Sequence, residues 1–236
     1  SITFAAKIDY KVGEFPYAVA LGNLNEDGRP DLVVVNMWSR SLSVLQNLTA
    51  GGTISFGNKT DYALGRDCRD IKIADLDGDG KNDLAVPSQI NDHISLFRNL
   101  GTGATILFAA KEDIATGASD PEDVVVADLD GDGKPDLAVT NNNTPGTISI
   151  FRNQSVSGSF SFPSKKDINT GPYAYRMVCA DFNGDGRPDL AIKDQYSSVL
   201  TLLENKCSPG VIVFAPKVDF PTTSTQREHI TAGEFN

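Results

Sequence analysis

Asp128-Leu-Asp-Gly-Asp-Gly-Lys-Pro-Asp136 is a nine-residue acidic loop near the middle of the chain. Three related copies begin at Asn23, Asp75 and Asp181, so successive copies start 52, 53 and 53 positions apart. A fixed period of about 50 residues is typical of propellers and other repeat arrays. The sequence therefore predicts one structural unit that is copied four times, each copy carrying the same loop.

The alternation within the loop predicts a cation site. Oxygen-bearing side chains at loop positions 1, 3, 5 and 9 can converge on one centre, and the glycine at position 6 permits the sharp turn that closes the cage. The backbone carbonyl at position 7 is the natural fifth ligand, with its basic side chain expected to point to solvent. No histidine or cysteine falls at a ligand position, which argues for Ca²⁺ over zinc or copper. The predicted metal ligands are Asn23, Asn25, Asp27, Arg29 and Asp31; Asp75, Asp77, Asp79, Lys81 and Asp83; Asp128, Asp130, Asp132, Lys134 and Asp136; and Asp181, Asn183, Asp185, Arg187 and Asp189.

The number of carboxylates differs among the four loops, and the expected calcium affinity differs with it. Loops two and three each offer four carboxylates, loop four offers three, and loop one offers two. Because fewer ligand charges attract a dication less strongly, we expect occupancy to fall from loops two and three to loop four and then loop one.

An EF-hand is the first alternative for this loop. It requires a glutamate at position 12 and a helix on each side, whereas position 12 here is Val34, Val86, Val139 or Ile192. The flanking residues are β-branched and apolar, as in Val124-Val-Val-Ala127, so the loop is predicted to join two strands of a β-hairpin. A metal-free turn rich in Asp and Gly is the second alternative.

Each unit contains four short runs with the character of strands. One run precedes the loop, one follows it, a third ends at an asparagine, and a fourth has the pattern Phe-x-x-Lys-x-Asp. Four such strands make one propeller blade. The predicted fold class is an all-β β-propeller of four-stranded blades, with four complete repeats plus partial blade strands at both ends of a single domain over 1–236. The predicted repeats span 10–61, 62–113, 114–167 and 168–219, and the partial strands span 1–9 and 220–236.

The phenylalanine of the fourth run is predicted to pack between neighbouring blades, because it recurs at the same place in every unit. The incomplete ends allow two interpretations: a piece of a longer protein, or a chain whose missing strands come from another copy. The phenylalanines of the fourth run are Phe56, Phe108, Phe162 and Phe214.

These motifs resemble the FG-GAP/VCBS repeat family, whose repeat occurs in integrin α-chain propellers. The resemblance is carried by Val126-Ala-Asp-Leu-Asp-Gly-Asp-Gly-Lys-Pro-Asp-Leu-Ala-Val139, by its counterparts, and by the Phe-x-x-Lys-x-Asp run. The family implies calcium held in hairpin loops on one rim of a propeller. It also implies recognition or adhesion at an extracellular or cell-surface location, and does not name a partner.

The composition argues against several functional classes. The formal net charge of −10 excludes a basic nucleic-acid footprint, and the absence of a 20-residue apolar span gives no support for membrane insertion. Only His93 and His229 are histidines, and no nucleophile-elbow, zinc-protease or phosphate-loop motif occurs. We therefore expect a non-enzymatic protein.

The cysteines and the glycosylation motifs give weaker signals. Cys179 lies in an apolar run and is interpreted as a buried small residue, and no bridge is expected between Cys68 and Cys207. The Asn-x-Ser/Thr motifs make four asparagines candidate glycosylation sites, although an asparagine that ends the third strand also serves as a turn cap. The candidates are Asn47, Asn58, Asn142 and Asn153.

The rim opposite the calcium loops is the expected binding surface, because its connections differ from repeat to repeat while the strands do not. The expected partner is a protein or a glycan. A ligand-recognition or adhesion module is the first functional hypothesis. A sugar-binding lectin and a structural glycoprotein that self-assembles through its incomplete ends as a homo-oligomer are the alternatives. The residues expected on this rim are Trp38, Arg40, Arg66, Arg69, Asn141, Asn142, Tyr173, Tyr175, Arg176 and Tyr196.

Overall fold

The structure is a computed structural model that describes residues 5–223 and 229–233. Over these residues the fold is all-β, with four antiparallel sheets of four strands each and no helix. Within the same residues no helix is long and apolar enough to cross a membrane. The predicted all-β class and the predicted four strands per repeat are confirmed.

Each sheet is one repeat, and its strands follow one another in chain order. Sheet 1 contains β1 (Pro16–Gly22), β2 (Asp31–Asn36), β3 (Ser41–Leu45) and β4 (Thr60–Ala63). Sheet 2 contains β5 (Lys72–Ala74), β6 (Asp83–Ser88), β7 (His93–Phe97) and β8 (Glu112–Ala115). Sheet 3 contains β9 (Pro121–Ala127), β10 (Asp136–Asn141), β11 (Gly146–Arg152) and β12 (Ser164–Gly171). Sheet 4 contains β13 (Ala174–Ala180), β14 (Asp189–Asp194), β15 (Val199–Leu203) and β16 (Val218–Pro221).

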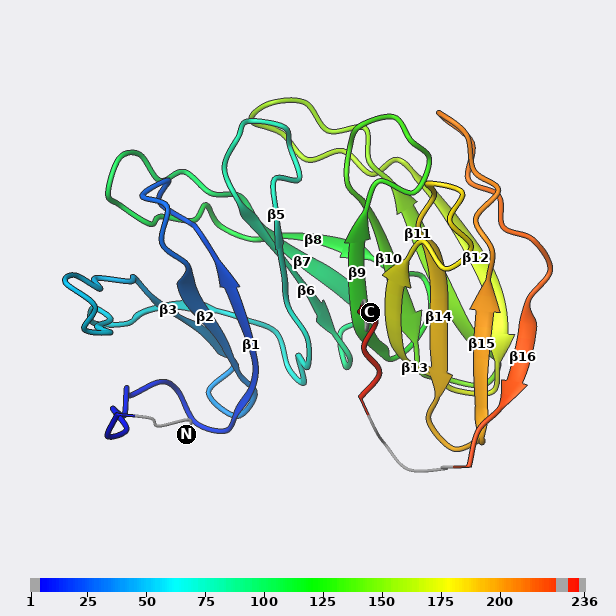
Figure 1. The fold of residues 1–236 in the computed structure, drawn as a ribbon, viewed down its shortest axis with the longest axis horizontal. Coiled ribbons are helices and arrows are strands. Elements are labelled where there is room, and N and C mark those ends of the chain that lie inside the picture. The colour runs from blue at the N-terminus through cyan, green and yellow to red at the C-terminus, as the bar shows by residue number, and fades with distance from the viewer. Residues whose placement is uncertain (1–4, 224–228, 234–236) are drawn as a thin grey trace.

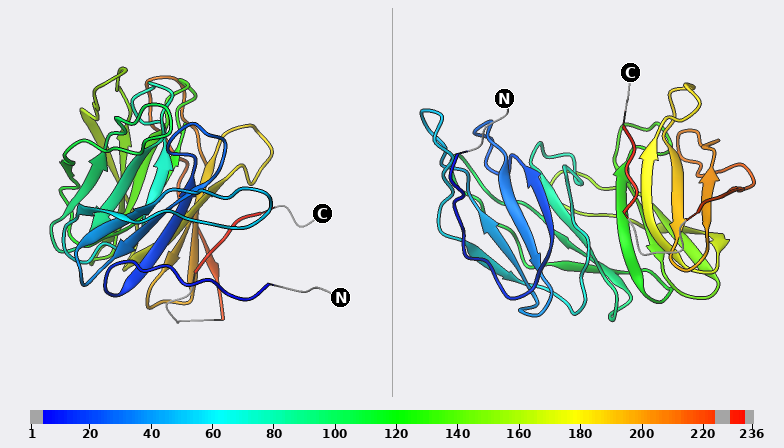
Figure 2. Two further views of the ribbon diagram at one scale, coloured as in Figure 1. Left: turned by 90° about the vertical axis from the view of Figure 1, so that its left-hand side faces the viewer. Right: turned by 60° about the horizontal axis from the view of Figure 1, so that its bottom comes forward.

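The four sheets stand side by side in an open, propeller-like fan (Figure 1). The first strands β1, β5, β9 and β13 line its inner side in that order. Figure 2 shows sheet 1 and sheet 4 separated across the opening, so the described residues do not close a ring. The acidic loops lie along one edge of the fan, because each follows the end of a first strand (Figure 1).

Three apolar clusters fill the spaces between neighbouring sheets. The cluster between sheets 1 and 2 contains Val33, Val35, Leu84 and Val86, each with no exposed surface. Phe108 of sheet 2 belongs to the same cluster and packs edge-on against Tyr62 of sheet 1, with ring centroids 5.4 Å apart. The predicted position of this phenylalanine between neighbouring repeats is confirmed.

The outward faces of the first and last sheets lack such a neighbour. Leu24, Leu76 and Leu129, at loop position 2, are 1–2 % exposed because the next sheet covers them, whereas the equivalent Phe182 of sheet 4 is 48 % exposed. On the other side of the fan, Val19 is 62 % exposed. The burial of a repeat position thus depends on the adjacent sheet.

The predicted strand limits need two corrections. The fourth strands begin four residues after the phenylalanine in sheets 1, 2 and 4 and two residues after it in sheet 3, and the predicted repeat boundaries fall inside β4, β8, β12 and β16. Phe56, Phe108 and Phe214 instead form isolated bridges with Asn47, Asn99 and Asn205, because the ladder is interrupted where the asparagine side chain turns to other partners.

The predicted partial strands at the ends are wrong for the residues that the structure describes. Residues 5–9 and 229–233 form no strand, because no second strand of their own sheet lies beside them to complete a ladder. Ile230 and Thr231 nevertheless lie against Val178 and Cys179 of β13. The remaining parts of these predictions, at 1–4, 224–228 and 234–236, lie outside the described residues.

The asparagine that ends each third strand joins two sheets. The Nδ2 group of Asn99 donates to the carbonyl of Asn82 in its own repeat at 3.0 Å and to the carbonyl of Leu24 in sheet 1 at 2.8 Å. Its Oδ1 accepts the amide of Gly101. Asn153 and Asn205 repeat this pattern toward Leu76 and Leu129.

Replacing Asn99 with alanine should lower the free energy of unfolding by about 2–4 kcal/mol, because it removes the donor to the buried carbonyl of Leu24 and to the half-buried carbonyl of Asn82. Asn47→Ala is the matched control, since the Nδ2 of Asn47 donates only to the carbonyl of Pro30 among the described residues. Urea unfolding of both variants measures the difference. Equal losses for the two variants would contradict a role for Asn99 in joining the sheets.

Candidate metal centre

Loops two and three gather three carboxylates each. One oxygen from each of Asp75, Asp77 and Asp83 lies within 4.8 Å of the others, and Asp128, Asp130 and Asp136 form the equivalent group in sheet 3. These residues occupy loop positions 1, 3 and 9. The structure thus brings together three of the four carboxylates predicted for each loop, and their oxygens form a donor set that suits a hard cation.

The loop backbone is held by the carboxylate at position 1. In loop two, Asp75 accepts hydrogen bonds from the amides of Gly78, Asp79 and Gly80 at 2.8–3.1 Å. Gly80 has a φ of 89°, a left-handed conformation that glycine adopts without a steric penalty. Loop three repeats these bonds at Asp128, so the position-1 carboxylate fixes the turn in both loops.

The carboxylate at position 9 anchors the loop to the sheet. Asp83 is fully buried and accepts the amides of Leu76 and Asn99 at 2.9 and 2.8 Å. Burial raises the pKa of Asp83 to about 7, the two amides oppose that rise, and the charges of Asp77 and Asp79 add to it. The pKa of Asp136 rises to about 6 for the same reasons. A cation in the cluster would favour the charged form of both groups.

The carboxylate at position 5 lies apart from these clusters because a basic residue holds it. In loop one, Arg29 donates to Asp27 at 2.5 Å and also to the carbonyl of Asn47. Arg187 makes the same pair of contacts in loop four. The prediction that the position-7 side chains point to solvent is therefore wrong for the two arginines, since the neighbouring carboxylate and carbonyl attract the guanidinium group.

The two lysines at position 7 also stay close to the protein. Lys134 donates to the carbonyl of Ser155 at 2.7 Å. The ammonium group of Lys81 lies 3.8 Å from Asp79. Loop two therefore keeps a long contact between its position-7 lysine and its position-5 carboxylate, whereas the lysine of loop three turns to Ser155.

Loop three contains a cation that the motif did not indicate. Arg152, at the end of β11, donates to Asp130 and to Asp132, both at 2.6 Å. Burial alone would raise the pKa of Asp130, but the bonds from Arg152 and from backbone amides lower it instead. In the other repeats the position of Arg152 is held by Gln46, Arg98 or Glu204. This variation in charge just before the asparagine of the third strand is the signal that the sequence offered.

Loops one and four form no three-carboxylate group among the described residues. Loop one has asparagines at positions 1 and 3, and the Nδ2 of Asn25 donates to Asp27 at 3.0 Å. In loop four, Asn183 donates to Glu204 at 3.2 Å, and its neighbour Phe182 is exposed. These two loops place their predicted ligands in the same turn, with fewer charges directed at a common centre.

Neighbouring sheets complete the clusters. The amide of Gly158 in sheet 3 donates to Asp77 of loop two at 2.9 Å, and the amide of Gly210 in sheet 4 donates to Asp130 of loop three at 2.9 Å. Both glycines lie in the connection between the third and fourth strands. The position-3 carboxylate is 2 % exposed in each of these loops, so the candidate site in one sheet depends on the next sheet along the chain.

The structure places the four sequon asparagines differently. Asn58 is exposed. Asn47 and Asn153 are buried and donate to carbonyls, and Asn142 donates to the side chain of Gln195 at 2.7 Å. The side-chain amide nitrogens of these three asparagines donate hydrogen bonds within the fold. Glycosylation stays a prediction, and Asn58 is the candidate whose side chain is exposed.

The cysteines are free in the structure. Cys68 and Cys207 are buried, and burial raises the pKa of the Cys68 thiol to about 12. The expectation that Cys68 and Cys207 form no bridge is confirmed.

The residues expected on the opposite rim divide into two groups. Trp38 and Tyr196 are more than half exposed, and Trp38 stacks on Phe15 with ring centroids 4.7 Å apart. Asn141 and Asn142 are buried, which corrects their placement on an open rim, because they bond to neighbouring side chains. Tyr175 and Arg176 are also buried, on the inner side of the fan.

Comparison with solved structures finds proteins with a similar fold. The N-terminal part of BBS1 (BBS1N), crystallised in complex with ARL6DN and soaked with mercury, matches with a TM-score of 0.58 at 15 % identity over 91 % of this chain and 56 % of that chain. The lead-soaked crystal of the same complex matches with a TM-score of 0.55 at 16 % identity, over 91 % of this chain and 58 % of that chain. The chain thus spans somewhat more than half the length of these structures. No curated protein matches the chain.

Comparison with family models matches the repeats themselves. The model of the FG-GAP-like repeat matches residues 23–86, 75–139 and 128–192. Each match begins at the first residue of one acidic loop and ends just after the next loop, at Val86, Val139 or Ile192. The three matches overlap and together cover well over half of the sequence. The chain therefore belongs to the FG-GAP repeat family.

Proposed function

We propose that this chain is a non-enzymatic module that binds calcium in its acidic loops and recognises a protein partner. The observation that carries the proposal is the pair of three-carboxylate clusters in loops two and three, set in repeats of the FG-GAP family. The donors are all oxygens, and the turn is already formed around them. Ca²⁺ is the biological cation that such flexible oxygen cages suit best.

The recognition role rests on the fold and on its neighbour. BBS1N is named in complex with ARL6DN, and a fan of repeats carries variable connections that can build a binding surface. We infer a β-propeller-type binding module located outside the cell or at its surface, where calcium is abundant enough for sites of modest affinity. We propose a protein rather than a glycan as the ligand, because BBS1N is in complex with the protein ARL6DN.

Self-assembly is a second candidate, and a specific observation favours it. Phe182 of sheet 4 and Val19 of sheet 1 are exposed at positions that are buried in the sheets with two neighbours. The three internal interfaces use the same repeat positions, so sheet 1 of a second copy is the partner whose surface corresponds best to the free face of sheet 4. Such head-to-tail contacts are heterologous and form rings or filaments.

Arg152→Gln should raise the calcium affinity of loop three by roughly tenfold, about 1.4 kcal/mol, because it removes a cation that competes for Asp130 and Asp132. The amide signals of Gly80 and Gly133 report on loops two and three separately in a calcium titration followed by NMR. Arg98→Gln is the matched control in sheet 2 and should leave the affinity of loop two within about twofold. An unchanged loop three in Arg152→Gln would contradict the competition.

Calcium binding at loops two and three should weaken as the pH falls through the range from 7 to 6, because burial raises the pKa of Asp83 to about 7 and that of Asp136 to about 6. Protons compete with the cation for a carboxylate whose pKa is raised. The same glycine signals, titrated at several pH values, test this range. Loss of binding in both loops at one common pH near 4 would contradict it.

In chelator, the raised pKa of Asp83 has the opposite consequence for folding. Its contribution to stability is present below the unfolded-state pKa of about 4 and is lost as the pH rises to about 7, because the fold disfavours the charged form. The difference in unfolding free energy between the native chain and Asp83→Asn should follow that window. A difference that is constant with pH would show that Asp83 titrates normally.

Native mass spectrometry tests the self-assembly candidate. We expect oligomers that grow with protein concentration and that Phe182→Asp abolishes. Leu107→Asp is the control, since Leu107 is 52 % exposed although its sheet has neighbours on both sides. A monomer at every concentration would rule the candidate out and leave the recognition module.

A further inference from the structure

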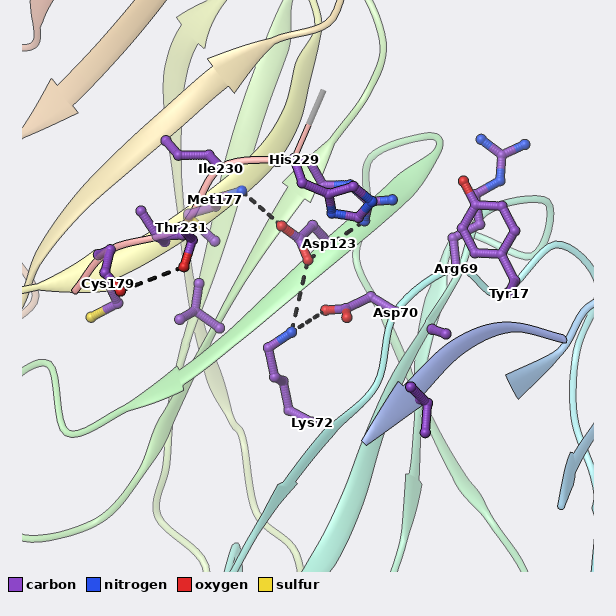
Figure 3. A pocket seen from close by; sticks show the side chains of 16 residues that line it. Tyr17, Arg69, Asp70, Lys72, Asp123, Met177, Cys179, His229, Ile230 and Thr231 are labelled. Atoms are coloured by element: carbon purple, nitrogen blue, oxygen red, sulfur yellow. Dashed lines mark hydrogen bonds and ion pairs between the residues drawn. The ribbon is translucent and has the colours of Figure 1, made fainter. Parts of the chain in front are cut away.

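A pocket of about 480 Å³ lies on the inner side of the fan and draws residues from all four sheets or from the connections that lead into them. Tyr17 comes from β1, Arg69 precedes β5, Asp123 lies in β9 and Arg176 in β13. Figure 3 shows Asp70, Lys72 and Asp123 directed toward one another, with Tyr17 and Arg69 beside them. These residues are at or near the starts of the first strands, away from the acidic loops.

Arg176 is the most unusual side chain in this pocket. It is 5 % exposed, yet its guanidinium group lies 3.8 Å from Asp123 and 4.0 Å from Glu122, beyond hydrogen-bonding distance. Its Nε has no hydrogen-bond partner within the part of the chain that the structure describes. The group lies over the ring of Tyr175, 4.8 Å from the centroid. A buried guanidinium with unused donors is costly unless an acceptor reaches it.

Arg69 adds a second guanidinium with spare donors. It contacts both oxygens of the buried Glu122 at 3.3 Å, and its Nε also lacks a partner among the described residues. Its guanidinium carbon lies 5.9 Å from the centre of the Tyr17 ring. Both arginines therefore approach Glu122, and each has a buried Nε that lacks a partner among the described residues.

The remaining charged groups of the pocket are largely occupied by one another. Asp123 accepts the amide of Met177 at 2.7 Å, and Asp70 accepts the ammonium group of Lys72 at 2.6 Å. Burial, with the nearby charge of Asp70, raises the pKa of Asp123 well above its ordinary value. Lys72 also lies 4.0 Å from Asp123, so Asp70, Lys72 and Asp123 compensate one another's charge.

The geometry points to a carboxylate as the ligand of this pocket, supplied by an aspartate or glutamate side chain of a protein partner and bound by Arg69 and Arg176. Guanidinium groups match the planar, two-oxygen geometry of a carboxylate. The pocket has the size of a small-ligand site, with tyrosine rings beside the charges. The assignment rests on the proposed recognition function and specifies its site and chemistry.

The side-chain Nε–Hε signals of Arg69 and Arg176 provide a direct test in the full chain. Titration with N-acetyl-aspartate N-methylamide should shift both signals saturably, with half-saturation at millimolar concentration, about 4 kcal/mol of binding. N-acetyl-asparagine N-methylamide, which lacks the charge, should shift neither. The absence of any shift with the aspartate probe overturns the proposal.

Variants separate this site from general charge effects. Arg176→Gln should weaken binding at least tenfold, and Arg176→Lys should weaken it less, because lysine keeps the charge without the planar fork. Arg66→Gln, an exposed position outside the pocket, should leave binding unchanged. If Arg176→Gln does not fold, the native chain with its charged and neutral probes still decides the question.

Two further measurements complete the test. One distinguishes a protein side chain from a small acid as the source of the carboxylate, and the other tests the proposed calcium binding separately from the pocket. Acetate that binds as tightly as the aspartate probe would assign the pocket to small acids and overturn the protein side chain as the source. The signals of Gly80 and Gly133 in calcium, recorded on the same samples, test the proposed function separately. If the glycine signals shift with calcium but the arginine signals do not shift with the aspartate probe, only this inference is rejected. If the arginine signals shift with the probe but the glycine signals do not shift with calcium, the calcium role is rejected.

Discussion

The buried carboxylate at loop position 9 is the interaction on which the rest of this structure depends. Asp83 receives one amide from its own loop and one from Asn99, and the side chain of Asn99 then donates to sheet 1. One acidic residue thus fixes the hairpin, the end of the third strand and, through the asparagine, the neighbouring sheet. Because buried polar groups are stable only when they are paired, loss of one of these contacts leaves another buried group without its partner.

This arrangement couples the candidate metal centre to the packing of the array. The cluster of loop two is closed by a glycine amide of sheet 3, and that of loop three by one of sheet 4. Loop four has no following sheet among the described residues and leaves Phe182 exposed. A cation bound in one loop would therefore stabilise an interface as well as a turn, by the linkage between binding and folding.

The acidic loops and the inner pocket lie at different edges of the fan and differ in their chemistry. The acidic loops at one edge repeat the same turn four times, with the full set of carboxylate donors in loops two and three. Near the starts of the first strands, the inner pocket combines residues that differ from repeat to repeat, including Tyr17, Arg69, Asp123 and Arg176. The repeated residues build the scaffold, and the residues that differ between repeats line the pocket that we propose as a recognition site.

The sequence alone determined the repeat, the four strands of each sheet and the loop residues, because period and alternation are local properties of the chain. It placed Asp75, Asp77 and Asp83 in one site correctly, and Phe108 at an interface. Only the tertiary structure decided that the side chain of Arg152 enters loop three and that Asn99 joins two sheets. It also decided that Arg176 is buried with no partner for its Nε among the described residues. These facts arise from contacts between residues far apart in the chain, whose geometry no local pattern encodes.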